Sequence, residues 1–277
     1  MIKNSELTFH ETFQPEITYI SKIMELASND FVGSKFDISD ATGIPTGKQK
    51  GKVEPHIKYA KFMGLINFMY SKGIYSLTLT NIGKEVILQD PYLHDDLTCW
   101  ICHYFMARKK LGAPQWSYLI HDAHPGFGES ISQEKVYINA TRWCDETLDN
   151  MSKRVFSPVK SSYTDGFFEK LNFLQWNDYI EFNEQHENFD LIFLYALALI
   201  DSWNIVFPDK PEITIYELKD ELGFDKIFGF NEEECNYVID SMAYEGVIKV
   251  NRQLFPPTII RTSNIDNIVS ELYSRLL

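Results

Sequence analysis

The chain has 277 residues, with 39 acidic and 26 basic side chains, so its formal charge at pH 7 is -13. Such an acidic body repels a polyanion overall, and any contact with nucleic acid must come from a local basic patch. Hydrophobic residues make up 44% of the chain, which is enough for two or three small cores. No apolar stretch reaches the roughly 20 residues of a membrane span, and the first residues lack a signal-peptide core. We therefore expect a globular, cytoplasmic protein with no membrane partner.

Two consecutive helices are predicted in the first third of the chain. Residues 36–43 begin with acidic and hydroxyl side chains and end at Gly43, a pattern typical of a short capped helix. After a loop, apolar residues recur at helical spacing, so a second helix is expected to begin near Glu54, with Pro55 in its first turn. Its apolar residues are Val53, Ile57, Ala60, Met63 and Leu65.

A β-hairpin is predicted directly after the second helix. Residues 66–70 and 74–80 alternate apolar and polar side chains on either side of a turn that contains Gly73. Two helices followed by a hairpin are the order of a winged helix-turn-helix unit. Such units bind DNA, but many serve only protein contacts or dimerisation.

The one basic run of the chain favours the DNA-binding alternative. It lies in the loop before the second helix and continues along that helix, where it falls mostly off the apolar face. We predict that its lysines contact the phosphates of double-stranded DNA, and that Gln49 and His56 are candidates for base contacts. The predicted DNA-binding residues are Lys48, Gln49, Lys50, Lys52, His56, Lys58 and Lys61.

Four scattered cysteines do not suggest a disulfide framework. Cys99 and Cys102 have the C-x-x-C spacing of a redox or haem-attachment motif and are followed by His103. Residues 97–107 also read as a buried helix, in which cysteine behaves as a small hydrophobe. No second cysteine pair completes a zinc site, so we expect these thiols to be part of the core.

The rest of the chain is expected to be mainly helical. The middle has helical periodicity with Pro and Gly breaks. Its longest apolar piece is residues 190–205, of which residues 191–200 are apolar all round, as in the central helix of a bundle. Near the end, two predicted helices and two strands repeat the winged-helix order. The second of these helices is acidic, and Asn231 and Glu234 predict a capping box at its start, so this unit is expected to pack against protein.

These elements predict a mainly α protein with small β wings in three domains. Residues 1–90 form an N-terminal winged helix-turn-helix domain, residues 91–210 a central helical bundle, and residues 211–277 a C-terminal winged-helix-like domain.

Several ordered motifs resemble one bacterial family. They are L-T-F-H-E-T-F at residues 7–13, the segment from Thr42 to Ile66, L-T-x-x-G at residues 79–83 and D-P-Y-L at residues 90–93. The chain resembles uncharacterised domains encoded beside sulfur-transfer enzymes in DNA phosphorothioation defence clusters, a family that includes the B component of the Ssp system. The resemblance covers about the first 125 residues. It implies a role in phosphorothioate DNA modification or the linked restriction, with nicking of one DNA strand as the implied activity.

A nickase needs an activated nucleophile and usually a divalent metal, here Mg or Mn. The candidate catalytic residues are His10 and Glu11; His121, Asp122 and His124; and Asp95 and Asp96 with His103. Each set also has a structural alternative. The first would brace the N-terminal segment, the second would be a polar loop, and the two aspartates would sit at a helix start. None has a known nuclease spacing.

Three functions follow from these expectations. The first is a DNA nickase, and the second is a non-catalytic DNA-binding subunit that docks the sulfur-transfer and ATPase proteins of the same cluster. The third is a transcriptional regulator of the cluster, which leaves the long middle region unexplained. Winged-helix proteins commonly bind half-sites as dimers, so a homodimer is a further expectation.

Overall fold

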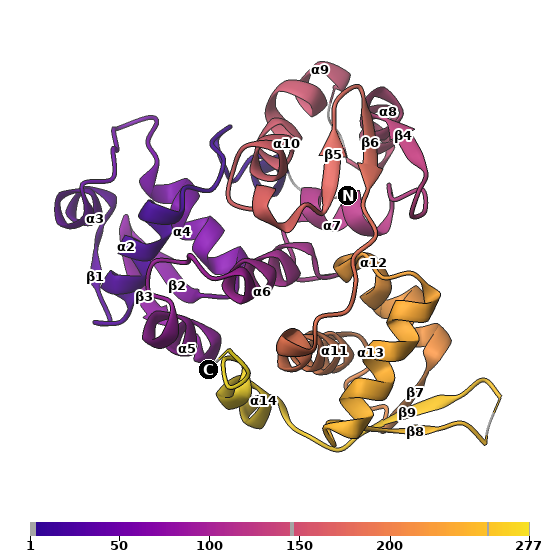
Figure 1. Cartoon of the computed structure of the whole chain (residues 1–277). Coiled ribbons are helices and arrows are strands. Elements are labelled where there is room, and N and C mark those ends of the chain that lie inside the picture. The colour runs from indigo at the N-terminus through magenta and orange to yellow at the C-terminus, as the bar shows by residue number, and fades with distance from the viewer. Residues whose placement is uncertain (1–3, 145–146, 254, 277) are drawn as a thin grey trace.

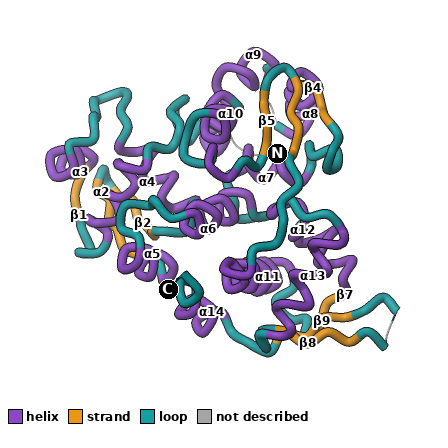
Figure 2. Tube along the Cα trace, in the orientation of Figure 1, coloured by secondary structure: helices purple, strands orange, loops and turns teal. Residues whose placement is uncertain are grey.

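The computed structural model describes residues 4–144, 147–253 and 255–276 (Figure 1). Within them, three small antiparallel sheets of three strands each are spread along the chain among helices (Figure 2). The expectation of a mainly helical protein with small β elements is confirmed. Each sheet belongs to a segment with the same order of elements, and we call these segments the first unit (residues 32–79), the second unit (130–182) and the third unit (212–261).

The first unit runs through β1 (Val32–Ser34), α3 (Lys35–Thr42), α4 (Val53–Phe62), β2 (Ile66–Ser71) and β3 (Ile74–Leu79). Its sheet has the order β1-β3-β2. The strand β1 was missing from the sequence-based expectation, because three residues are too few to display a period of two.

Local chemistry explains where the helices of the first unit begin and end. The Ser34 hydroxyl accepts from the Asp37 backbone N–H, and the Asp37 carboxylate accepts from the Ser34 N–H, so α3 begins with a capping box. It ends at Gly43, whose φ of 71° is in the left-handed region that glycine adopts without cost. The five apolar residues predicted for the second helix and the turn after it are all buried.

Two helices pack on this unit, α2 (Ile17–Ala27) and α5 (Asn81–Gln89). The short helix α1 (Asn4–Leu7) instead contacts α7 (Pro114–His121). The helix α2 packs on α3, α4 and β3, so the apolar face of α4 is closed by residues upstream of the unit.

The second unit differs from the expected plain helical bundle. It contains β4 (Ser130–Ser132), α8 (Gln133–Trp143), α10 (Ser157–Thr164), β5 (Leu174–Trp176) and β6 (Tyr179–Phe182), with the sheet order β4-β6-β5. Short helical segments join α8 to α10 and follow α10. They are α9 (Leu148–Asn150), the π-helical η1 (Met151–Val155) and η2 (Glu169–Leu171). The signal in the sequence that was missed is the alternation of residue types through β5 and β6, whose residues are alternately buried and exposed in the structure.

The sheet of the third unit has the same strand order as the other two sheets, with the last strand in the middle. The predicted helix that ends at Gly223 and the acidic helix after it are both present. The predicted capping box is only half formed, because Asn231 caps the helix while the Glu234 carboxylate bonds His186 and the Glu187 N–H. The elements are β7 (Glu212–Thr214), the π-helical η4 (Glu217–Leu222), α12 (Phe224–Phe228), α13 (Glu232–Tyr244), β8 (Ile248–Asn251) and β9 (Thr258–Arg261).

Four helices outside the units hold them together. They are α6 (Asp96–Ala107), α7 (Pro114–His121), α11 (Ile192–Val206), which follows the short η3 (Phe189–Leu191), and α14 (Ile265–Glu271). The helix α11 packs against α6, α13 and α14, and α14 reaches back to α5 beside the first unit (Figure 1).

The apolar residues 189–206 are long enough to cross a membrane by length and composition, but most of this segment is buried inside the protein, as expected for a core helix. Cys99 and Cys102 are fully buried in α6, and burial raises the pKa of both thiols, so they behave as core residues.

Candidate nucleic-acid interface

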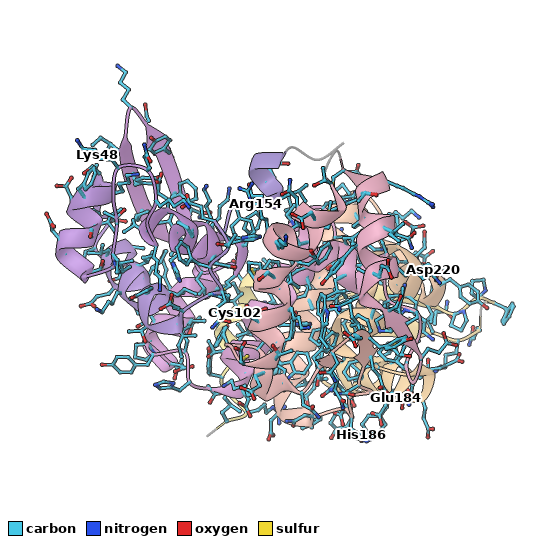
Figure 3. The ribbon with its side chains drawn as sticks, turned by 90° about the horizontal axis from the view of Figure 1, so that it is seen from above. Lys48, Cys102, Arg154, Glu184, His186 and Asp220 are labelled. Carbon is cyan, nitrogen blue, oxygen red and sulfur yellow. The ribbon has the colours of Figure 1, made fainter. Side chains whose placement is uncertain are left out.

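The loop between α3 and α4 presents its basic tip to solvent. Its two ends are tied together, because the Lys52 N–H donates to the Pro45 carbonyl at 2.8 Å. Gly51 lies so close to Thr46 that a Cβ at this position would meet the Thr46 side chain at 2.5 Å. Lys48, Gln49 and Lys50 lie between these ties and are exposed. Figure 3 shows Lys48 at the outer edge of the first unit.

Lys52 is turned away from the tip. Its ammonium lies 2.7 Å from a Glu16 carboxylate oxygen and about equally far from the rings of Phe13 and Tyr19, at 5.4 and 5.5 Å. The hydrogen bond to Glu16 raises the pKa of Lys52. The structure therefore removes Lys52 from the set of free phosphate contacts, because a carboxylate already neutralises its charge.

His56 is fully buried and is not at the surface as the base-contact prediction requires. Its Nε2 accepts from the Glu16 N–H at 3.1 Å, and its Nδ1 lies 2.6 Å from the Lys52 carbonyl oxygen, to which it donates. Burial lowers the pKa of this imidazole. His56 thus fixes the start of α4 and the loop before it, and in this conformation it does not reach a ligand.

Two further predicted lysines lie on α4. Lys58 is half-buried, while Lys61 is exposed and sits 5.4 Å from the centre of the Phe68 ring. Within the described part of the chain, Lys48, Lys50, Lys58 and Lys61 form no ion pair with a carboxylate. Their charges are consequently available to an external anion.

The hairpin β2–β3 is fastened to α4 through one carboxylate. Glu54 accepts from the Tyr75 hydroxyl and from the Lys35 ammonium, each at 2.8 Å. These bonds set the hairpin beside the start of α4. The hairpin carries exposed apolar side chains that sequence reasoning did not single out, at Met69, Tyr70 and Ile74.

The first catalytic candidate, His10, is a fully buried residue. Its Nδ1 accepts from the Thr12 N–H at 3.2 Å, and its Nε2 lies 3.3 Å from the Gln115 side-chain nitrogen. Burial lowers the pKa of His10 to about 3, so the ring is neutral at pH 7. The next residue, Glu11, lies in a turn with a φ of 49°. Its backbone N–H donates to the Thr8 carbonyl.

The second candidate set is split between core and surface. His121 and His124 are buried, and burial lowers their pKa values to about 3 and about 4, whereas Asp122 between them is exposed. The Nε2 of His121 lies 3.0 Å from the Ala107 carbonyl, and the His124 ring stacks on Phe182 at 4.0 Å. Asp122 is the member of this set that solvent reaches.

The third candidate set is also dispersed. Asp95 caps α6 by accepting from the Leu97 N–H, and Asp96 lies 3.0 Å from the Lys170 ammonium. His103 is buried between the Tyr163 hydroxyl and the Ile227 carbonyl, each at 2.8 Å. In the described ranges no three His, Cys, Asp or Glu side chains are grouped so that they could hold a metal ion.

Comparison with known proteins identifies the fold. No protein-family model matches the chain, and no curated protein sequence matches it. Two crystal structures of SspB are similar, one of which is described as magnesium ion-bound. Their TM-scores are 0.77 and 0.74, and each match is 16% identical and covers 97% of this chain and 87% of the SspB chain. The similarity to SspB that the sequence motifs indicated is confirmed, and this chain has the SspB fold.

Proposed function

We propose that this protein is a cytoplasmic DNA-binding component of a bacterial DNA phosphorothioate modification or restriction system that defends against phage. The observation that carries the proposal is the pair Lys48 and Lys50, exposed at a closed loop tip with no carboxylate partner among the described residues. The SspB fold supports the assignment to such a system.

The proposal treats the first unit as a winged helix-turn-helix. In this unit α3 is the positioning helix, α4 is the helix that approaches the duplex, and the β2–β3 hairpin is the wing. The tip lysines and Lys61 then neutralise phosphates, while Gln49 remains the exposed candidate for a base contact. The acidic third unit faces protein partners, for which the sulfur-transfer and ATPase proteins of the cluster are the proposed candidates.

Binding rather than nicking is the function we propose. The candidate histidines are neutral, buried and engaged with backbone or aromatic groups, which suits bracing of the core better than proton transfer. One SspB structure is described as magnesium ion-bound. The described residues of this chain offer no cluster of three ligands for a metal, so we derive no chemical step through magnesium or manganese.

A plasmid assay tests the proposal. Supercoiled plasmid is incubated with the protein with and without Mg²⁺ or Mn²⁺, and both topology and electrophoretic mobility are measured. We expect a mobility shift without relaxation. If the plasmid is relaxed by the wild-type protein but not by Asp122→Ala, the protein is a nickase and the proposal of binding alone is wrong. If the mobility of the plasmid does not shift, DNA binding is rejected altogether.

A further inference from the structure

The second unit repeats the arrangement of the first unit around a helix that faces solvent. In both units a strand leads into a helix, a second helix follows, and a hairpin completes a sheet in which the last strand lies in the middle. The helix α10 of the second unit therefore occupies the position that α4 occupies in the first. In each unit the residues just before this helix are basic.

The outer side of α10 carries hydroxyl and ammonium groups. Ser157 and Thr164 are exposed, and Lys160 is half-buried and donates to the Asn177 carbonyl in the hairpin turn at 3.3 Å. Arg154, in η1 just before α10, is exposed and forms no ion pair with any described carboxylate. Hydroxyl, ammonium and guanidinium groups are the side chains that contact phosphate oxygens in protein–DNA interfaces.

Ser157, Lys160 and Thr164 line a shallow depression of about 410 Å³, together with Lys153 and Ser161. Arg154 is not part of this lining but follows the lining residue Lys153 in the chain. Two carboxylates modify its charge. Asp165 lies in the lining, and Asp149 pairs with Lys153 at 2.6 Å, although both members of this pair are about 70% exposed. An exposed pair of this kind contributes little and is easily exchanged for a phosphate.

Both units lie near His10, because the charges of Arg154 in η1 and of Lys58 on α4 add to burial, the largest cause, in lowering the pKa of this buried imidazole. In Figure 3, Arg154 lies between the first unit, which carries Lys48 at its outer side, and the second unit, while Glu184 and His186 lie at the lower side of the view, away from Lys48.

We propose that η1 and α10 form a second contact for the phosphate backbone of the DNA duplex that the first unit binds. This inference rests on the proposed function. The duplex would run from the loop tip of the first unit, past Lys58 and Arg154, onto Lys160 and the hydroxyl groups of α10. The acidic third unit would stay clear of it.

The test measures binding of fluorescein-labelled duplexes by anisotropy over a range of salt concentrations. The probes are a duplex of about one helical turn and one of about three turns. The variants are Arg154→Ala with Lys160→Ala, Lys48→Ala with Lys50→Ala for the first contact, and Lys249→Ala, an exposed lysine in the third unit, as the matched control. Thermal melting confirms that each variant is folded.

On the long duplex, we expect Arg154→Ala with Lys160→Ala to lower the slope of log K against log salt by about 0.9 for each lost phosphate contact. The short duplex should be affected less, and Arg154→Lys should retain most of the binding. If the first-contact variant weakens binding but Arg154→Ala with Lys160→Ala matches the control, the second contact is refuted and the proposed function stands. If wild-type protein binds neither duplex, both are refuted.

Discussion

The first and third units have one topology and opposite surface chemistry. Both begin with a short strand that ends in a capping residue, because Ser34 pairs with Asp37 and Thr214 pairs in the same way with Glu217. Both have a first helix that ends at a glycine with positive φ, and both end in a hairpin whose last strand is central. The backbone plan is thus the same.

The segments between the two main helices differ. In the first unit this segment is a loop with Lys48 and Lys50 exposed at its tip. In the third unit it contains the helix α12, whose Phe224 and Phe228 are buried, and the next helix begins with three glutamates. Those glutamates lie at the positive end of the helix dipole, where they stabilise the helix and repel phosphate. Shared topology therefore does not determine the partner, whereas the residues placed at one loop do.

The largest expected effect is a loss of stability in acid, caused by buried histidines that lie outside both the first and the third unit. Burial lowers the pKa values of His10 and His121 to about 3 and those of His103 and His124 to about 4, while residues 207–277 contain no histidine. The unfolded chain binds protons near pH 6.5 and the folded chain does not, so stability falls as the pH decreases from 7 to 5. At pH 5 each of these four histidines lowers the unfolding free energy by at most roughly 2 kcal/mol.

Urea unfolding at pH 7, 6 and 5 measures this loss, and hydrogen exchange locates it. Carboxylates whose pKa values are lowered, such as Asp37 and Glu217, lose their contribution only below about pH 4.5, so they do not interfere. His94→Gln, at an exposed histidine, is the control and should leave the slope unchanged. An unfolding free energy that is constant from pH 7 to 5 would contradict the buried, neutral histidines.

The two helix-ending glycines sharpen the comparison. Gly223 has a φ of 67°, and a Cβ at this position would meet the His121 ring at 2.3 Å. Gly223→Ala should therefore lower the unfolding free energy by roughly 2–4 kcal/mol. Gly43→Ala has a similar φ of 71° but its nearest neighbour is the Lys22 ammonium at 4.0 Å, so about 1 kcal/mol is expected. Chemical denaturation of both variants measures the difference, and equal losses would show that the His121 contact does not matter.

Charge reversal tests the different partners of the two units. Lys48→Glu with Lys50→Glu should weaken duplex binding about tenfold or more, or about 1.4 kcal/mol, because two phosphate contacts become repulsive. The thermal midpoint should be unchanged, since both side chains are exposed. Lys249→Glu in the third unit is the matched control, and an equal effect of this control would indicate a non-specific response to net charge.

The smallest effect is expected at Lys52. Its ion pair with Glu16 is about one-third exposed, so Lys52→Ala should cost at most about 1 kcal/mol of stability. Because the ammonium is already neutralised, the salt dependence of DNA binding should not change. Anisotropy titrations at several salt concentrations check this, and a slope reduced by about 0.9 would show that Lys52 exchanges Glu16 for a phosphate.

The sequence alone determined the elements whose signals are local. The glycine stop at Gly43, the cap at Asn231 and the apolar spacing from Val53 to Leu65 each depend on neighbours within one or two turns, and all appear in the structure. The motifs of the first third also pointed to the SspB fold. The three-residue strands were missed, because β1, β4 and β7 form only where a distant hairpin supplies hydrogen-bond partners.

Tertiary structure alone decided which candidate side chains are available. Lys52 and His56 share the basic run with Lys48, yet Glu16, 36 residues away from Lys52, engages both of them through its carboxylate and its backbone N–H. His10, His103 and His121 look equally polar in the sequence but are buried by segments far along the chain. Burial and charge pairing are set by long-range packing, which a local pattern does not contain.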